Sequence, residues 1–495
     1  MRRTLRLIVL LAVSIAATAA LATVGGSTGP SSSDSPYLVR MKPGVVLKSI
    51  LTVGDAVPKA NAEAGEEYRL VGKPDGLGAF DNGDGTFTLL MNHELGPNAG
   101  IVRAHGALGS FVSRYVIRKD DLSVVEGEDL IKSVATWNVP LGRYNDPTTG
   151  IALRDLCSAT LPPRSALYNE ATGNGYDGRI FMGGEEVNNG GRAFGHLLNG
   201  TSYELPALGK AGWENQVAHR DTGDKTVVVG LDDTSSMASP GGQVYVYVGE
   251  KKAEGNPVER AGLTGGTLYG IKVAGYPTEP EATGIPSDTP FVGHSFGDVS
   301  ARSGGQLNTA SVATGVTLFK RPEDGVWSTT NPNDFYFATT GFQRGISRAW
   351  RLHFEDPTDP AQGGTISMVL DGTETEGYRQ LDNVTANERG RLIIQEDPGD
   401  SIRPAHVWQY DIASDALEAV AMADPVRFGS PEPQLSPEPP FTQEEESSGV
   451  IDASELLGDG WYLLDFQAHY PHPDAELVQG GQLLAMHIPP GRPVD

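Results

Sequence analysis

The stretch DNGDGTFTLLMNHE at residues 81–94 decides the fold, because its pattern returns along the chain. It passes through a turn of Asp, Asn and Gly, continues as a mostly apolar strand and ends on an acidic residue. Five further stretches repeat this pattern and usually end on Glu, Asp or His: 174–186, 214–233, 321–339, 382–397 and 446–469. Repetition on this scale is typical of propellers, solenoids and other arrays.

We therefore predict an all-β protein, a six-bladed β-propeller with long insertions between blades. The 62 Gly and 34 Pro residues supply tight turns and interrupt nearly every segment long enough for a helix. Residues 37–40 or 45–53 could supply the strand that closes the ring. Two packed β-sandwiches are the alternative, but they would not explain one motif recurring from end to end. Further strands are predicted at 111–117, 243–248, 267–273, 349–354, 407–411 and 482–488, and insertions at 251–320 and 421–445.

The N-terminus predicts export from the cytoplasm. Three arginines precede an apolar run at 7–21, and Ala20-Leu21-Ala22 resembles a signal-peptidase site. We expect a signal peptide at 1–22, a flexible leader at 23–34 and a single propeller domain at 35–495. A permanent anchor is the rival interpretation, but the apolar run is short for a membrane span. General secretion and twin-arginine export both remain open, and we expect a secreted or extracytoplasmic monomer without a membrane anchor after cleavage.

The formal net charge of −25 excludes nucleic acid as a partner, because phosphates select basic surfaces. An acidic excess indicates either a solvated acidic surface or carboxylates that hold cations. The repeat favours the second interpretation, because its acids lie beside Gly and apolar residues instead of in charged runs.

In a propeller, equivalent strand ends of all blades meet around the central channel. We expect the acids of the repeat to converge there, although each alone could equally make a surface turn. Converging carboxylates repel one another and need cations, and carboxylate oxygens suit calcium. The candidate metal ligands are Glu94, Glu185, Glu186, Glu214, Asp232, Asp233, Glu323, Asp382, Glu396, Asp397 and Glu446.

The only cysteine, Cys157, lies outside the repeat as we define it. It is either a buried structural residue or a metal ligand, and a thiolate would favour iron or zinc. The sequence contains no nucleophile elbow, P-loop or zinc-protease motif.

From about Tyr68 to Ile488 the chain resembles the PhoX-type alkaline phosphatases, a family of secreted bacterial metalloenzymes. The matching segments are Met91-Asn92-His93-Glu94, Cys157 with Gly183-Gly184-Glu185-Glu186, Trp213-Glu214-Asn215 with Leu231-Asp232-Asp233, Phe319-Lys320-Arg321-Pro322-Glu323, Leu381-Asp382-Asn383 with Glu396-Asp397, and Glu446 with Gln467-Ala468-His469. The resemblance implies a six-bladed propeller with calcium and iron that hydrolyses phosphate monoesters.

The resemblance also implies roles for individual residues. Cys157 would bind iron, and Arg321, Asn92 and Asn383 would grip the substrate phosphate. Iron and calcium would be held by Glu94, Glu185, Glu214, Glu323 and Asp397. A secreted phosphomonoesterase is the leading hypothesis, with a small phosphate ester as substrate. A propeller hydrolase of another ester or of phytate, and a non-catalytic binding propeller stabilised by calcium, are the alternatives.

Overall fold

The computed structural model describes residues 26–236, 239–341, 345–399, 403–431 and 434–489. The predicted signal peptide at 1–22 lies outside these residues. Strands dominate the described chain, as predicted, and its helices are short: α2 (Arg164–Leu167), α3 (Pro257–Arg260), α4 (Gly304–Thr314), α5 (Pro425–Phe428) and α6 (Ser454–Leu457). Within the described residues, no helix combines the length and the apolar character needed to cross a membrane.

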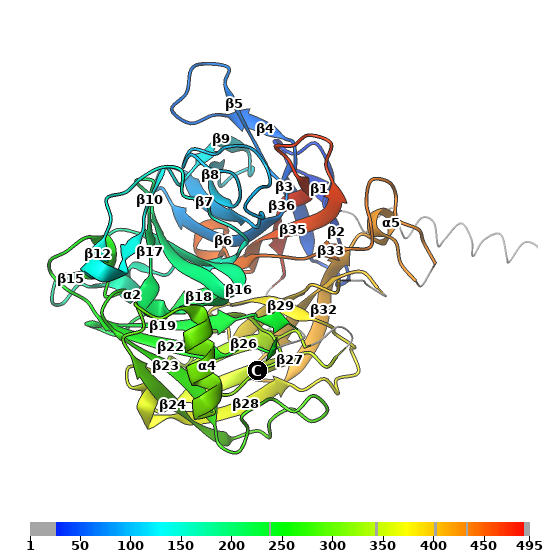
Figure 1. The fold of residues 1–495 in the computed structure, drawn as a ribbon. Coiled ribbons are helices and arrows are strands. Elements are labelled where there is room, and N and C mark those ends of the chain that lie inside the picture. The colour runs from blue at the N-terminus through cyan, green and yellow to red at the C-terminus, as the bar shows by residue number, and fades with distance from the viewer. Residues whose placement is uncertain (1–25, 237–238, 342–344, 400–402, 432–433, 490–495) are drawn as a thin grey trace, which may run out of the picture.

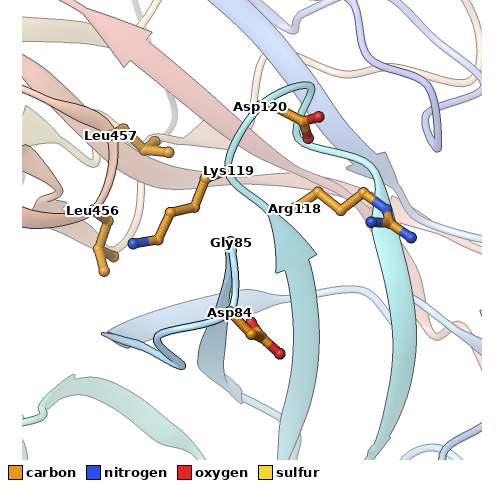
Figure 2. Close-up of a pocket in the computed structure, with 7 residues that line it drawn as sticks. All are labelled: Asp84, Gly85, Arg118, Lys119, Asp120, Leu456 and Leu457. Atoms are coloured by element: carbon orange, nitrogen blue, oxygen red, sulfur yellow. The ribbon is translucent and has the colours of Figure 1, made fainter.

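The first sheet follows directly from the repeat. Its antiparallel strands pair in chain order: β6 (Pro74–Asp81), β7 (Thr86–His93), β8 (Phe111–Arg118) and β9 (Val124–Asp129). The turn between β6 and β7 is held by its own acids, since Asp81 accepts a hydrogen bond from the amide of Gly83 and Asp84 accepts one from that of Thr86. Figure 2 shows this turn end, where Lys119 and Arg118 of the next turn line a surface recess with Leu456 and Leu457.

The following strands pair as further groups, in which neighbours are antiparallel except that β10 and β17 are parallel. One contains β13 (Leu156–Thr160), β16 (Ile180–Leu197), β17 (Thr201–Glu204) and β10 (Ser133–Ala135). The next contains β18 (Lys210–Ala218), β19 (Lys225–Asp232), β22 (Val244–Glu250), β23 (Thr267–Val273) and β24 (Thr289–Gly297). The third contains β25 (Pro322–Trp327), β26 (Asp334–Thr339), β27 (Arg348–Phe354) and β28 (Gly364–Leu370).

Two sheets complete the arrangement and take in N-terminal strands. One contains β29 (Leu381–Ala386), β30 (Arg391–Glu396), β31 (His406–Asp411), β32 (Ala416–Ala423) and β2 (Leu38–Arg40). The other contains β33 (Glu445–Glu446), β34 (Val450–Asp452), β35 (Trp461–Pro471), β36 (Gln479–His487), β3 (Val46–Thr52) and β1 (Ser27–Thr28). Both candidate closing segments are thus used, because β2 pairs with β32 and β3 pairs with β36.

Short pairs of strands decorate these sheets. They are β4 (Ala56–Pro58) with β5 (Glu67–Arg69), β11 (Trp137–Asn138) with β12 (Arg143–Tyr144), β14 (Tyr168–Asn169) with β15 (Asn174–Gly175), and β20 (Ser235–Ser236) with β21 (Ser239–Pro240).

The first strands of the groups form a ring. In chain order, β6, β13, β18, β25, β29 and β34 each contact the next, and β34 contacts β6. A channel runs between them and is lined by residues of all these strands, among them Leu77, Ala159, Val217, Val326 and Val384. Figure 1 shows the sheets arranged around this ring of first strands, with the first and last sheets side by side. The fold is a β-propeller, as predicted.

The count of six blades stays a prediction. Ladders between β16 and β18, and between β24 and β28, join three of the strand groups into one 13-stranded sheet. Hydrogen bonding alone therefore does not divide the molecule into six separate sheets.

The segment expected to be a flexible leader differs from the expectation over its described part, 26–34. Strand β1 pairs in parallel with β3, and Asp34 forms an ion pair with Arg427 at 2.7 Å. The small residues that suggested flexibility serve close packing instead. A Cβ atom at Gly26 would lie 2.4 Å from the Leu47 carbonyl, and one at Gly29 would lie 2.1 Å from the Ser49 carbonyl.

The predicted insertion at 251–320 contains two strands and two helices. Strands β23 and β24 extend a sheet, and α4 packs against β16 and β18 (Figure 1). This helix was missed, although the sequence carries its start and stop signals. Ser303 and Gln306 form a capping box, and Gly315 ends the helix in the left-handed conformation.

Candidate metal centre

One position near the start of each first strand carries a side chain that can bind a metal ion. In β6, β13, β25, β29 and β33 it is the second residue of the strand. In β18 it is the fifth residue, Glu214. The six side chains are Asp75, Cys157, Glu214, Glu323, Asp382 and Glu446. Cys157 therefore belongs to the repeat, and placing it outside was wrong. The second copy of the repeat was started at its turn, at residue 174, whereas Cys157 lies in the first strand before that turn, at the place that Glu214, Glu323 and Asp382 occupy in later copies.

A β-bulge accompanies this position. The pairing register of the first strand shifts just there, as between Asp75 and Leu77 in β6 and between Pro322 and Gly325 in β25. Equivalent shifts occur in β13, β18 and β29. In the last sheet the strand is interrupted between Glu446 of β33 and Val450 of β34. Bulges redirect side chains and are frequent beside functional sites, so this local geometry turns each ligand-capable residue toward the mouth of the channel.

In each sheet a residue that follows the apolar run of the second strand is hydrogen-bonded to the residue two positions before the ligand-capable side chain of the first strand. The amide of Glu94 donates to the carbonyl of Lys73 at 3.0 Å, and that of Glu186 donates to the carbonyl of Asp155 at 2.8 Å. The same bond joins Asp233 to Gly212, Thr340 to Arg321, Asp397 to Gln380 and His469 to Glu444. The ends of the predicted strands therefore do lie at one mouth, together with the starts of the first strands.

Four of these carbonyl-bearing residues have a left-handed backbone, which is unusual for residues other than glycine. Their φ angles are 49° at Lys73, 45° at Asp155, 61° at Arg321 and 43° at Gln380. Such conformations cost on the order of 1–3 kcal/mol each and persist only where the surroundings enforce them. Backbone strain is thus concentrated at the mouth.

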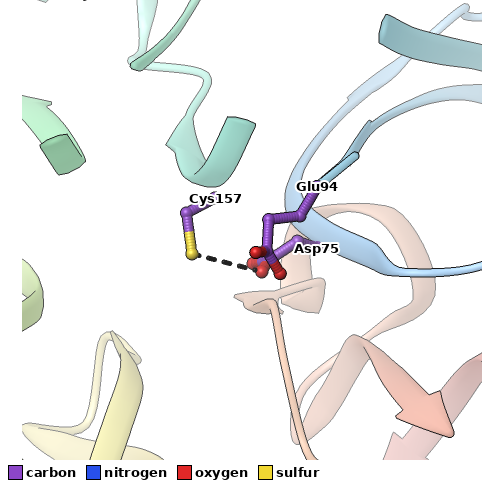
Figure 3. A group of neighbouring side chains, drawn as sticks. All are labelled: Asp75, Glu94 and Cys157. Atoms are coloured by element: carbon purple, nitrogen blue, oxygen red, sulfur yellow. Dashed lines mark hydrogen bonds between the residues drawn. The ribbon is translucent and has the colours of Figure 1, made fainter. Parts of the chain in front are cut away.

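Three groups of side chains here could each hold a metal ion, because their ligand atoms lie within 4.8 Å of one another. They are Asp75, Glu94 and Cys157; Cys157, Glu186 and Glu214; and Glu214, Glu323 and Asp382. Figure 3 shows the first group, in which the Cys157 thiol lies 3.5 Å from Oδ2 of Asp75. Cys157 and Glu214 each belong to two groups, so the groups form a continuous series that suits several ions.

The electrostatics of the mouth favour bound cations. Burial, reinforced by neighbouring carboxylates, raises the pKa of Asp75 and Glu214 well above its usual range, and it does the same at Glu186, Glu323 and Asp382. Burial also raises the pKa of Asp397 to about 6. One oxygen of Glu214 has no hydrogen-bond partner among the described residues. Without cations these groups would hold protons, whereas ions would satisfy their oxygens directly.

Three basic side chains oppose the carboxylates. Lys73 pairs with Glu94 at 2.8 Å, and Arg321 pairs with Asp233 at 2.8 Å and with Glu323 at 3.1 Å. His469 lies 3.3 Å from Glu446. Burial lowers the pKa of His469, but its hydrogen bond to Glu446 and the charge of that carboxylate outweigh burial and raise it to about 9.

The donor set of the mouth fits metal ions. Its carboxylates are the hard oxygen ligands that calcium prefers, and the one thiol is suited to a softer ion such as iron. Burial, together with nearby Asp75 and Glu214, raises the pKa of Cys157, so a bound cation would have to displace its proton.

Six predicted ligands lie outside these three groups: Glu185, Asp232, Asp233, Glu396, Asp397 and Glu446. Asp233, Asp397 and Glu446 still lie at the mouth, whereas the other three have protein partners away from it. Glu185 forms an ion pair with Arg192 at 2.5 Å, and Glu396 forms one with Arg403 at 2.6 Å. Asp232 accepts hydrogen bonds from the Gly212 amide and the Thr234 hydroxyl. Each precedes a residue at the mouth, and since successive strand residues face opposite sides, its side chain points away from the site.

The predicted phosphate-binding residues differ in their surroundings. The Asn92 side chain is buried and donates to the Cys157 carbonyl at 2.8 Å, so it holds the backbone of a candidate ligand in place. Asn383 is also buried, and its amide has no partner among the described residues. The Arg321 side chain is 25% exposed and is the one of the three that reaches the surface of the mouth.

Asp75 and Lys73 were missed. The segment Lys73-Pro74-Asp75-Gly76 matches Arg321-Pro322-Glu323-Asp324 residue for residue in chemical type except at its last position. Comparing the segments before the turns, and not only those after them, would have found both.

Comparison with known proteins supports the fold. No family model matches the chain, and no curated protein matches it by sequence. Among solved structures, PhoX of Pseudomonas fluorescens in complex with vanadate, a transition-state analogue, is similar with a TM-score of 0.63 and 13% identity over 91% of this chain and 95% of that one. An α-L-arabinanase of Penicillium chrysogenum matches with a TM-score of 0.39 and 9% identity, over 88% of this chain and 97% of that one. The likeness to PhoX shows that the two chains share a fold.

Proposed function

We propose that the protein is a metal-dependent phosphomonoesterase whose centre lies at the carboxylate-rich mouth of the propeller. The observation that supports this most is the series of donor groups that share Cys157 and Glu214, beside a partly exposed arginine. The fold shared with PhoX, which was solved with a transition-state analogue, is consistent with the proposal.

In this proposal the donor groups hold calcium, with iron at the groups that contain Cys157. Bound cations supply charge that neutralises phosphate oxygens and favours attack on phosphorus. Asp233 and Glu323 fix the guanidinium of Arg321. Glu323 does this while it also belongs to the third donor group. Asp233 alone accepts bonds from both Nε and Nη2, so the guanidinium is oriented before substrate arrives and can grip a phosphate without further ordering.

The donor atoms are also positioned in advance. Asn92 holds the Cys157 carbonyl, and Thr340 donates to Glu323 at 2.6 Å. Gln467 donates to Asp75 and Glu94 at 3.2 Å each. These contacts limit the movement of the ligands and so reduce the reorganisation that binding requires.

We also propose the predicted surroundings of the enzyme. It would be exported, cleaved near residue 22 and act as a monomer on small phosphate esters. N-terminal sequencing of the mature protein and its mass in solution would test these points.

Elemental analysis of protein purified without chelator, together with a p-nitrophenyl phosphate assay with and without EGTA, tests the function. We expect calcium, iron and phosphatase activity that EGTA abolishes. Calcium without iron and without phosphatase activity would contradict the proposal and favour a calcium-stabilised binding propeller.

A further inference from the structure

Lys73 and Arg321 occupy equivalent positions in two sheets. Each lies two residues before a ligand-capable acid and is followed by proline. The carbonyl of Lys73 accepts a hydrogen bond from the end of β7, and that of Arg321 accepts one from the end of β26. Both have a left-handed backbone, with φ of 49° and 61°.

Their side chains also have matching surroundings. The Lys73 ammonium lies 2.8 Å from Glu94 and the Arg321 guanidinium 2.8 Å from Asp233, both carboxylates at ends of second strands. The two side chains are 20% and 25% exposed, so each reaches solvent at the mouth. The other equivalent positions carry no basic residue: Asp155, Gly212, Gln380 and Glu444.

The two basic residues lie on opposite sides of the mouth. They precede β6 and β25, which are three steps apart in either direction around the ring of first strands. The acids that act on them differ accordingly: Glu94 and Glu446 act on Lys73, whereas Asp233, Glu323 and Glu186 act on Arg321. Lys73 and Arg321 therefore place positive charge on two opposite sides of the mouth, and His469 beside Glu446 adds a third basic group there.

The backbone of Lys73 is costly to maintain. A residue before proline prefers an extended conformation, and a positive φ departs from this preference. A lysine on an ordinary surface could pair with an acid without such strain. The equivalent Asp155 and Gln380 share this left-handed backbone, so it is a property of the repeat position, and at Lys73 the proline that follows adds to its cost.

We propose that Lys73 is a second substrate-binding cation, which recognises an anionic group on the alcohol part of the phosphate ester. This inference rests on the proposed function, in which Arg321 holds the phosphate that is removed. In this proposal the leaving group of an ester held by Arg321 extends across the mouth toward Lys73, which lies on the opposite side of the ring. An ammonium is a point charge with three donors, so it accepts a carboxylate or a second phosphate without a fixed fork geometry.

The test compares phenyl phosphate with 3-carboxyphenyl phosphate in the metal-loaded protein and in Lys73→Gln. We expect the wild-type protein to favour the carboxylated ester in kcat/KM and the variant to lose this preference by about tenfold. Calorimetry with phenylphosphonate and 3-carboxyphenylphosphonate, which are not hydrolysed, should show the same change in relative affinity. Lys73→Arg should restore the preference.

Lys119→Gln is the matched control. Lys119 belongs to the same sheet, is 24% exposed and pairs with Asp81 at 2.7 Å, but it lies at the turn end (Figure 2). Lys119→Gln removes the same charge as Lys73→Gln and should leave the preference for the carboxylated ester intact. Equal losses for both compounds in Lys73→Gln, or no loss for either, would overturn the inference.

The two proposals can fail separately. Hydrolysis of both esters by the wild-type protein with a preference that Lys73→Gln retains would overturn only the role of Lys73. No hydrolysis by the wild-type protein would refute the proposed function. In that case a preference for the carboxylated phosphonate that is lost in Lys73→Gln would still support Lys73 as an anion-binding residue, and equal binding would overturn that role too.

Discussion

The two ends of the β6–β7 hairpin carry the same kind of residue in opposite states. At the turn end, Asp81 and Asp84 are exposed, and hydrogen bonds from Lys119 and from Thr86 respectively lower their pKa values. At the mouth end, Asp75 is buried, and desolvation raises its pKa. The turn acids stabilise the chain by bonding to it in their charged form, whereas the mouth acid is desolvated and lies beside the carboxylates of Glu446 and Glu94, which disfavour its charge. Carboxylates that shape a fold and carboxylates that await a ligand thus differ in burial, not in sequence.

Removing the metals should reveal this difference most strongly. The raised pKa values mean that the mouth carboxyls contribute their full stability to the metal-free protein only below their unfolded values of about 4, where they are protonated in both the folded and unfolded states. That stability is lost as pH rises through the folded values. For Asp397, whose pKa moves to about 6, the loss is roughly 3 kcal/mol. The midpoint temperature of thermal unfolding should therefore fall between pH 5 and pH 8 in EDTA-treated protein and stay nearly constant in metal-loaded protein. A metal-free protein that gains stability over this pH range would show that the mouth carboxyls are not destabilised by burial.

Glu214→Gln separates metal binding from folding. The substitution removes a shared ligand, and we expect a loss of bound metal and at least a hundredfold loss of phosphatase activity. Because it also removes a buried charge, the metal-free variant should be more stable than the metal-free wild type at pH 8. Elemental analysis and thermal unfolding measure the two effects. A variant that binds the normal complement of metal would show that Glu214 is not a ligand.

Cys157→Ala tests the one soft ligand. We expect iron and any iron-dependent colour to be lost while calcium is retained, since the remaining ligands are oxygens. Optical spectra and elemental analysis of the purified variant provide the measurement. Unchanged iron content would limit Cys157 to packing, and Cys157→Ser would then behave like the alanine variant.

Asp84→Asn is the smallest change and the counterpart of the others at the turn end. It weakens the bonds that Asp84 accepts from the amide and hydroxyl of Thr86. We expect only a small loss in unfolding free energy, because Asp84 is exposed to solvent, and no change in metal content or activity. Urea denaturation measures the first effect, and a clear loss of metal would contradict the division between the two ends of the hairpin.

Much of the fold could be predicted from the sequence. The strand expected at 267–273 is β23, and all the apolar runs of the repeat are second strands of their groups. Alternation and turn residues are local signals, so they survive without tertiary information. Helix α4 was missed because Gly, Ser and Thr obscured its pattern, although its capping residues were visible.

The site was predictable only in part. Glu185 and Glu186 are adjacent and equally acidic. Only the side of the strand from which each side chain projects decides that Glu185 pairs with Arg192 and that Glu186 joins a donor group. Asp75 was missed because the first copy of the repeat was started at its turn, at Asp81, so the segment before that turn was not compared with Arg321-Pro322-Glu323. The left-handed backbone of Lys73 and Arg321 depends on contacts with distant strand ends, which no local pattern encodes.

The pairing of β3 with β36 has a consequence for the order of assembly. Nearby, the Tyr37 amide donates to Gln482 across 445 positions of sequence, so this seam joins the earliest described strands to the last. During synthesis the seam cannot form until the final strands have emerged, and contacts of such long sequence separation are slow to form. Lys73 and Glu94 lie on one side of the seam and Glu446 on the other. The mouth would thus acquire its full set of charges only at the last step of folding, and a nascent chain would have no complete centre to load with metal.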